Sequence, residues 1–164
     1  MSYPEPRYRG EGGEASAVLR PADHVPEISG PAEGQSAHYL ATGKCTGGDF
    51  GLYRWNMGVE PTGPSPHFHR TMSESFFVID GEVRLYDGQG WRDAHAGDFL
   101  YVPPGGIHGF RNESGAPASM LILFTPGAPR EAYFEGLNDW ATGRRTFTDE
   151  EFTQFCIEHD NHYL

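Results

Sequence analysis

Four residues in the middle of this 164-residue chain have the types and the spacing of a metal-binding set. His67 and His69 are two positions apart, so on a strand both imidazoles lie on one face, which is the interior face in a small barrel. Glu74 follows at the start of an expected strand, and His108 stands on a separate strand after a turn. Three imidazole nitrogens and one carboxylate that converge from neighbouring strands would bind a divalent metal ion.

Glycines and prolines at fixed distances extend this pattern into two parts. In the first part, His67 and His69 are followed after four residues by Glu74, and Glu74 is followed after six residues by Gly81. The glycine supplies a turn conformation that other side chains resist. A lone histidine is more often a hydrogen-bonded structural residue, but the regular spacing favours a ligand set here.

The second part surrounds His108. Gly97 is followed after five residues by Pro103, then by Gly105, His108 and Asn112. The prolines stiffen the turn before the histidine, and Gly105 supplies a turn conformation beside the ligand. Asn112 is expected to hold backbone at the end of a strand.

The two parts together resemble the paired motifs of the cupin superfamily, over residues 37–125. The opening glycine of the first motif is replaced by Pro61, with Gly58 and Gly63 nearby, so the entering loop is expected to have a different shape. The resemblance implies an all-β fold, a cupin-type antiparallel β-barrel (a double-stranded β-helix, or jelly roll). It also implies the following metal ligands: His67, His69, Glu74 and His108.

The expected cofactor is one divalent transition-metal ion. The donors are nitrogen and oxygen with no thiolate, and four protein ligands leave two positions of an octahedral ion open. This set suits Fe, Mn, Ni or Co, and Zn in a tighter site. Because one carboxylate faces a dication, the site would carry a charge near +1 and accept an enolate, phenolate or carboxylate.

Strand alternation predicts the walls of a substrate pocket. Residues two and four positions after Glu74 share its face, the residue two after His108 shares that ligand's face, and the bulky set of residues 50–57 is the expected interior set. An aromatic pocket suits a planar, oxygen-rich substrate. The simpler alternative is that these side chains only fill the barrel. The predicted wall residues are Tyr53, Trp55, Met57, Phe76, Val78 and Phe110.

The chain resembles single-domain, metal-binding cupins, and two enzyme classes follow from that resemblance. In quercetin 2,3-dioxygenase-like enzymes the metal holds a deprotonated substrate and dioxygen, and Glu74 would be both a ligand and the catalytic base. In monocupin polyketide cyclases, and in isomerases, the metal acts as a Lewis acid without redox chemistry. A third reading is a binding protein for a small ligand. The oxygenase is the leading prediction, and the motifs alone do not separate the three.

The elements that position these residues are short strands broken by turn signals. We expect an arm at residues 1–36 with a short strand at 16–20, the barrel at 37–125 and a helical C-terminal tail at 126–164. Asp80-Gly81 and Asp87-Gly88 are predicted hairpin turns. Strands are predicted at residues 38–41, 50–57, 74–79, 82–86, 91–94, 99–102, 107–111 and 118–124.

The tail is predicted to contain two helices. One covers residues 130–137, and the second begins at the capping box of Thr148 and Glu151. Phe152, Phe155, Cys156 and His159 share one helical face, which is expected to pack on the barrel or on a partner subunit. Two weaker candidates are residues 159–162 as a metal-binding tract, and Arg70 as a residue that steers an anionic substrate.

Composition and charge argue against several other classes of protein. The formal net charge of −11 and the absence of a basic cluster argue against nucleic-acid binding. No window approaches the roughly 20 apolar residues of a membrane span, and the first residues lack the apolar run of a secretory signal. Cys45 and Cys156 are expected as free thiols in a reducing compartment, so we expect a cytoplasmic protein. The resemblance further implies a homodimer formed through outer sheets, with a small molecule as substrate.

Overall fold

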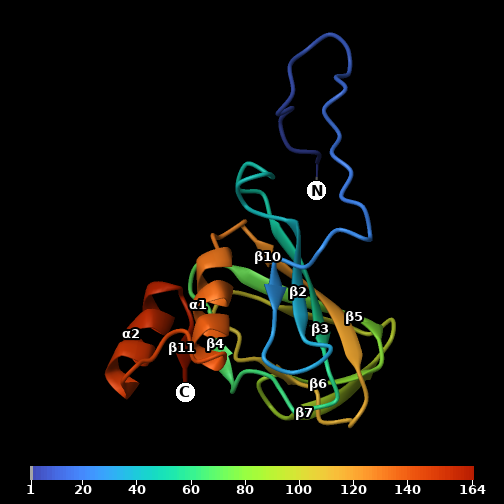
Figure 1. Cartoon of the computed structure of the whole chain (residues 1–164). Coiled ribbons are helices and arrows are strands. Elements are labelled where there is room, and N and C mark those ends of the chain that lie inside the picture. The colour runs from blue at the N-terminus through green and yellow to red at the C-terminus, as the bar shows by residue number, and fades with distance from the viewer. Residues whose placement is uncertain (1) are drawn as a thin grey trace.

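The computed structural model describes residues 2–164, and most of its regular structure is antiparallel β-sheet (Figure 1). The largest sheet has the order β1-β2-β3-β10-β5-β8, a second has the order β7-β6-β9, and a third pairs β11 with β4. The strands are β1 (Ile28–Ser29), β2 (Ser36–Ala41), β3 (Gly51–Met57), β4 (His67–Phe68), β5 (Ser73–Asp80), β6 (Glu82–Tyr86), β7 (Trp91–His95), β8 (Phe99–Val102), β9 (Gly109–Arg111), β10 (Ala118–Thr125) and β11 (His162–Tyr163).

The predicted all-β class with a short helical tail is confirmed, and each predicted strand of residues 38–124 lies within two residues of an observed one. The two-residue strands β1, β4 and β11 were not predicted, because such short segments carry no alternation. The strand expected at residues 16–20 is wrong. Val18 and Leu19 there are 95% and 86% exposed, and this blue segment extends away from the sheets in Figure 1, so it has no strand to pair with.

One of the two predicted hairpin turns has a different role. Asp87-Gly88 joins β6 to β7, which pair as an antiparallel hairpin as predicted. Asp80-Gly81 instead carries the chain from the large sheet into the three-stranded sheet, since β5 pairs with β10 and β8 and not with β6. Gly81 has φ +75°, and a Cβ there would lie 2.5 Å from the carbonyl oxygen of Pro117. A glycine is therefore required at this crossing between sheets.

Side chains of β5 point alternately to the interior of the barrel, where Glu74 and core residues lie, and to the outer surface. Glu74, Phe76 and Val78 are buried, whereas Phe77 and Ile79 on the opposite face are 40% and 38% exposed. β5 lies between β10 and β8 in the large sheet, and its buried residues face the interior of the barrel. The carboxylate predicted as a metal ligand thus lies on a strand whose inner face is buried.

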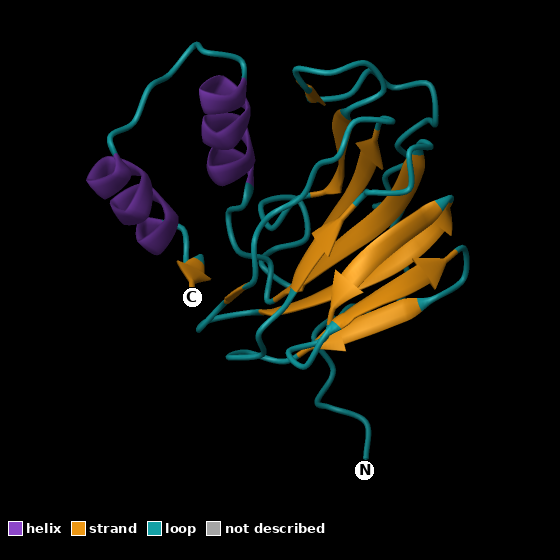
Figure 2. Ribbon diagram, turned by 90° about the horizontal axis from the view of Figure 1, so that it is seen from below, coloured by secondary structure: helices purple, strands orange, loops and turns teal. Residues whose placement is uncertain are grey.

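The C-terminal tail forms helices α1 (Glu131–Ala141) and α2 (Asp149–Glu158), which lie together at one side of the barrel (Figures 1 and 2). The predicted capping box is present: Glu151 N donates to Thr148 Oγ1, and Thr148 N donates to the Glu151 carboxylate. Tyr133 of α1 stacks on Phe155 of α2 at 5.6 Å between centroids, which joins the two helices. Among residues 2–164, no helix is long and apolar enough to cross a membrane.

Candidate metal centre

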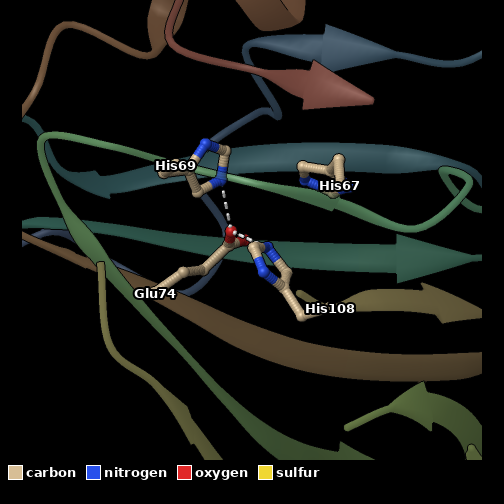
Figure 3. A group of neighbouring side chains, drawn as sticks. All are labelled: His67, His69, Glu74 and His108. Carbon is tan, nitrogen blue, oxygen red and sulfur yellow. Dashed lines mark hydrogen bonds and ion pairs between the residues drawn. The ribbon is translucent and has the colours of Figure 1, made fainter. Parts of the chain in front are cut away.

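Four buried side chains meet inside the barrel, and they are the predicted ligands (Figure 3). His67, His69, Glu74 and His108 are each at most 4% exposed. One nitrogen or oxygen atom from each lies within 4.8 Å of those from all the others. Donor atoms about 2 Å from one ion lie within about 4 Å of one another, so this group needs only a small inward shift to hold one ion.

Backbone pairing fixes three of these residues relative to each other. His67 and His108 form an antiparallel bridge, with N–H to O distances of 2.9 Å in both directions. Gly105 N donates to the carbonyl of His69 at 2.7 Å, and Gly105 has φ +81°. The turn at residues 103–106 therefore docks on the first ligand segment, which is the structural reason for its proline and glycine.

Each ligand histidine is oriented through Nδ1 by a backbone carbonyl. His67 Nδ1 bonds the oxygen of Ser65 at 2.9 Å, and His108 Nδ1 bonds that of Gly106 at 3.0 Å. His69 Nδ1 bonds the oxygen of Asp160 at 2.6 Å. Since a carbonyl only accepts, Nδ1 carries the proton in all three rings. Every Nε2 is then left to bind a cation, an arrangement typical of metal-ligating histidines.

The contacts of Glu74 test whether this set fits a metal ion. Its Oε2 lies 2.8 Å from Nε2 of His69 and 2.8 Å from Nε2 of His108. With Nδ1–H donated to a carbonyl, a neutral ring presents a lone pair at Nε2, and a lone pair repels a carboxylate. A positive charge must lie between them, either protons on both rings or one divalent cation. The donor set therefore fits a divalent metal ion.

The pKa shifts describe the same buried group. Burial lowers the pKa of His67 to about 4, which favours the neutral ring that a metal requires. For Glu74, burial raises the pKa, but the bonds to His108 and His69 outweigh burial and hold that pKa well below its usual range. Burial lowers the pKa of His108, and its bond to Glu74 reverses the shift, so the net change is upward. Glu74 is thus an anion at neutral pH.

The tail tract at residues 159–162 supports the site without belonging to its donor group. Asp160 accepts from the amides of Arg70 and Thr71 through its carboxylate, while its carbonyl accepts from His69. His159 Nδ1 bonds the carbonyl of Phe155, and His162 stacks on Phe68 at 5.1 Å. The donor atoms of neither histidine are part of the four-residue group.

Asn112 and Gly63 shape the loop that enters the site. Asn112 is buried, and its Nδ2 donates to the carbonyls of Gly58 and Ala116 at 2.8 and 2.7 Å, so it holds backbone as predicted. Gly63 has φ +140°, and a Cβ there would lie 2.0 Å from the carbonyl oxygen of Phe110. Gly63 thus allows the backbone of this loop to approach Phe110 closely. Pro61, two residues earlier, occupies the position of the opening glycine of the first cupin motif.

A cavity of about 450 Å³ adjoins the metal centre, with His67 and Glu74 in its lining. Of the predicted wall, Trp55 and Phe110 line this cavity. The other four are buried in the core and are not part of the lining: Tyr53, Met57, Phe76 and Val78. Their contact with a substrate stays a prediction.

Much of the cavity wall comes from segments outside the predicted barrel. Ile28 and Gln35 contribute from the segment before residue 37, and Tyr133, Phe134 and Tyr163 contribute from the tail. These residues were missed because the motif spacing ends near residue 125. The helical periodicity of the tail predicted a packed face, but not that the face closes a cavity.

The arginine in this cavity is also one that the sequence did not single out. Arg130 lines the cavity and is 3% exposed. Arg70, the predicted steering residue, is exposed in the turn after the first two ligands, and its side chain lies 5.9 Å from the ring of Phe68, outside the cavity lining. Arg130, and not Arg70, is therefore the arginine of the cavity lining.

Comparisons with known proteins agree with this fold. Residues 55–124 match the family described as "Cupin domain". Over 74 residues the chain is 32% identical to the quercetin 2,3-dioxygenase of Bacillus subtilis, a match of 44% of this chain and 21% of that protein. The chain thus spans about a fifth of the length of this relative.

Two solved structures are similar over larger parts of the chain. The polyketide cyclase RemF from Streptomyces resistomycificus is 19% identical with a TM-score of 0.54, covering 66% of this chain and 78% of that one. A cupin-superfamily sugar phosphate isomerase from Silicibacter pomeroyi is 29% identical with a TM-score of 0.50, covering 57% and 60%. The first likeness concerns the fold alone, since its identity is low.

Proposed function

We infer that this chain, whose residues 55–124 match the cupin domain family, is a metal-dependent enzyme that acts on a small organic molecule. We propose an oxygenase that resembles quercetin 2,3-dioxygenases and acts on a phenolic or enolic substrate. The observation that carries the proposal is that a complete donor set adjoins a cavity lined by aromatic rings. The donor residues are His67, His69, Glu74 and His108. A binding protein needs the cavity but does not require a complete donor set.

The residues of this chain have distinct roles in the proposed reaction. When bound, a divalent ion of iron, manganese, nickel, cobalt or zinc supplies Lewis acidity, and a redox-active ion also permits chemistry with dioxygen. Glu74 is an anion beside the cavity, so its carboxylate accepts the proton of the substrate hydroxyl. Trp55 and Phe110 contact the flat faces of the substrate and exclude water from it.

Oxygen uptake tests the proposal. The full-length protein is prepared without metal and oxygen, loaded in turn with Fe, Mn, Ni, Co or Zn, and offered flavonols and other phenolic enols. Uptake of oxygen that requires both the metal and Glu74 supports an oxygenase. Oxygen uptake per bound metal ion that is undiminished in a Glu74→Gln variant would remove the proton-accepting role.

A non-redox cyclase or isomerase is the second candidate. It is favoured by the likeness to the sugar phosphate isomerase, and the same four donors serve Lewis-acid chemistry. Substrate turnover without oxygen uptake, retained with Zn, would support this candidate over the oxygenase. Binding without turnover under any metal would favour the third reading, a small-ligand binding protein.

A homodimer and a cytoplasmic location stay predictions. The outward side chains of β5 and β8 include Phe77 beside Phe99, which is 62% exposed, and Tyr101, which is 57% exposed. β8 is also the edge of the large sheet. We propose that a second copy of this chain covers this face. Light scattering of the wild type and of a Phe99→Ser, Tyr101→Ser variant tests this directly.

Cys45 and Cys156 are free thiols, as a reducing compartment would leave them.

A further inference from the structure

Arg130 is a buried cation with unused hydrogen-bond donors. Its guanidinium donates through Nη1 to the carbonyl of His159 and through Nη2 to Oδ1 of Asn161, at 2.5 and 2.7 Å. A guanidinium has five N–H groups, so three are left: one on each Nη and the one on Nε, which is buried and has no partner among residues 2–164. No carboxylate of those residues forms an ion pair with it. A buried charge without an anionic partner is costly, which calls for an explanation.

The surroundings of Arg130 position it without neutralising it. Its guanidinium carbon lies 5.1, 4.4 and 5.4 Å from the ring centroids of Phe124, Tyr133 and Phe134. Ring faces attract a cation but accept few of its N–H groups. All three rings line the same cavity as Glu74 and Arg130. The aromatic cluster therefore fixes the guanidinium at the cavity wall with its charge unpaired.

The charge of the cavity changes when the metal site is filled. Glu74 is the group that most favours the charged form of Arg130, against burial, which lowers its pKa. A dication bound by Glu74 and the three histidines would leave a charge near +1 at that end, so Glu74 no longer offsets the guanidinium. The cavity would then carry about two positive charges. A neutral phenol would compensate neither of these positive charges, and a phenolate would compensate one of them.

We propose that Arg130 binds a carboxylate of the substrate, so that the substrate is an organic acid with an ionisable hydroxyl group that faces the metal ligands. This proposal deepens the proposed function and rests on it for the second group. The planar guanidinium keeps one unused N–H on each of Nη1 and Nη2, and this pair suits a planar carboxylate. Arg130 is thus a specificity-determining residue, and the hydroxyl end of the substrate is processed at Glu74.

Paired probes test the charge preference directly. The full-length protein loaded with Zn is titrated calorimetrically with 4-hydroxybenzoate and with its neutral amide, 4-hydroxybenzamide. We expect the acid to bind at least about tenfold more tightly, the usual effect of one charge-assisted hydrogen bond. Arg130→Gln should remove this preference, and Arg130→Lys should keep part of it. Arg70→Gln is the matched control and should leave it unchanged.

A second measurement needs no variant, because Arg130 also holds the tail in place. In ¹⁵N NMR spectra of the wild type, the unpartnered Nε–H of Arg130 should shift when 4-hydroxybenzoate is added, and should stay in place with the amide. An acid preference that survives in a folded Arg130→Gln protein, or an Nε–H signal unmoved by the acid, would overturn the proposal. Neither readout needs turnover, so a protein that takes up no oxygen but keeps the preference would overturn the oxygenase and leave Arg130 assigned.

Discussion

The carbonyl oxygen of Asp160 accepts a hydrogen bond from Nδ1 of His69 at 2.6 Å, across 91 residues of sequence. The carboxylate of Asp160 at the same time accepts from the amides of Arg70 and Thr71 and from the Thr71 hydroxyl. Asp160 has φ +57°, a conformation that Asp and Asn tolerate better than most residues. The C-terminal tail is therefore a part of the metal centre's support.

Removing the Asp160 side chain should weaken metal binding without removing a ligand. Asp160→Ala loses the bonds that hold residues 70 and 71 and places alanine at positive φ, so the carbonyl no longer fixes His69. We expect the metal affinity to fall about 10- to 100-fold, as for other residues that orient a ligand. Asp160→Asn should lose less. Competition with a chelating dye measures the affinity, and Asp139→Ala, which breaks the exposed pair with Arg144, is the control. Equal affinities for Asp160→Ala and the control would refute this role.

The sequence predicted which four donor side chains come together, but not which residues support them, for physical reasons. His67 and His69 could be placed on one face because strand geometry is local, and the spacing to Glu74 and His108 carried the rest. The partner of His69 lies in the tail, where the contact depends on how two helices fold back onto β4. No local periodicity of the sequence predicts how these helices return to β4. The role of Arg130 could not be predicted from local sequence either, because its position at the start of the tail's first helix gives no sign that it lines a cavity.

Neutralising Glu74 should abolish tight metal binding and leave the barrel folded. Glu74→Gln keeps the size of the side chain but removes the negative charge that faces His69 and His108. Elemental analysis of the purified protein should show one metal ion per wild-type chain and less than a tenth of that in the variant. Circular dichroism should show an unchanged sheet signal. Glu82→Gln, at the exposed end of β6, should retain the metal. Full metal content in Glu74→Gln would disprove its assignment as a ligand.

Gly63→Ala should destabilise the loop that enters the site. A Cβ at this position would lie 2.0 Å from the carbonyl oxygen of Phe110, and the φ of +140° is strained for alanine. We expect the free energy of unfolding to fall by at least about 2 kcal/mol, because backbone on both sides must shift. Gly90→Ala is the matched control, since a Cβ there meets nothing within 4 Å. Urea denaturation compares the two, and similar midpoints would show that the loop adapts freely.

The metal-free protein should lose stability as the pH falls from 6.5 to about 4. Burial lowers the pKa of His67 in the folded state to about 4, while the unfolded chain has the ordinary value of 6.5. Between these values the unfolded chain binds a proton that the folded protein does not, so the free energy of unfolding decreases by up to about 3 kcal/mol. His108, whose pKa is raised, contributes stability that is fully present below pH 6.5 and is lost only above it. Glu74, whose pKa is lowered, loses its contribution only below about 4.5.

Substitution of His67 isolates this effect. In urea denaturation with a chelator present, the slope of stability against pH between 6.5 and 4.5 should be steep in the wild type and flatter in His67→Gln. His95→Gln, which removes an exposed imidazole on β7, should keep the wild-type slope. An identical slope in all three proteins would mean that His67 takes up its proton in the fold as readily as in the unfolded chain. Burial would then not be what keeps this ring neutral and ready for a metal ion.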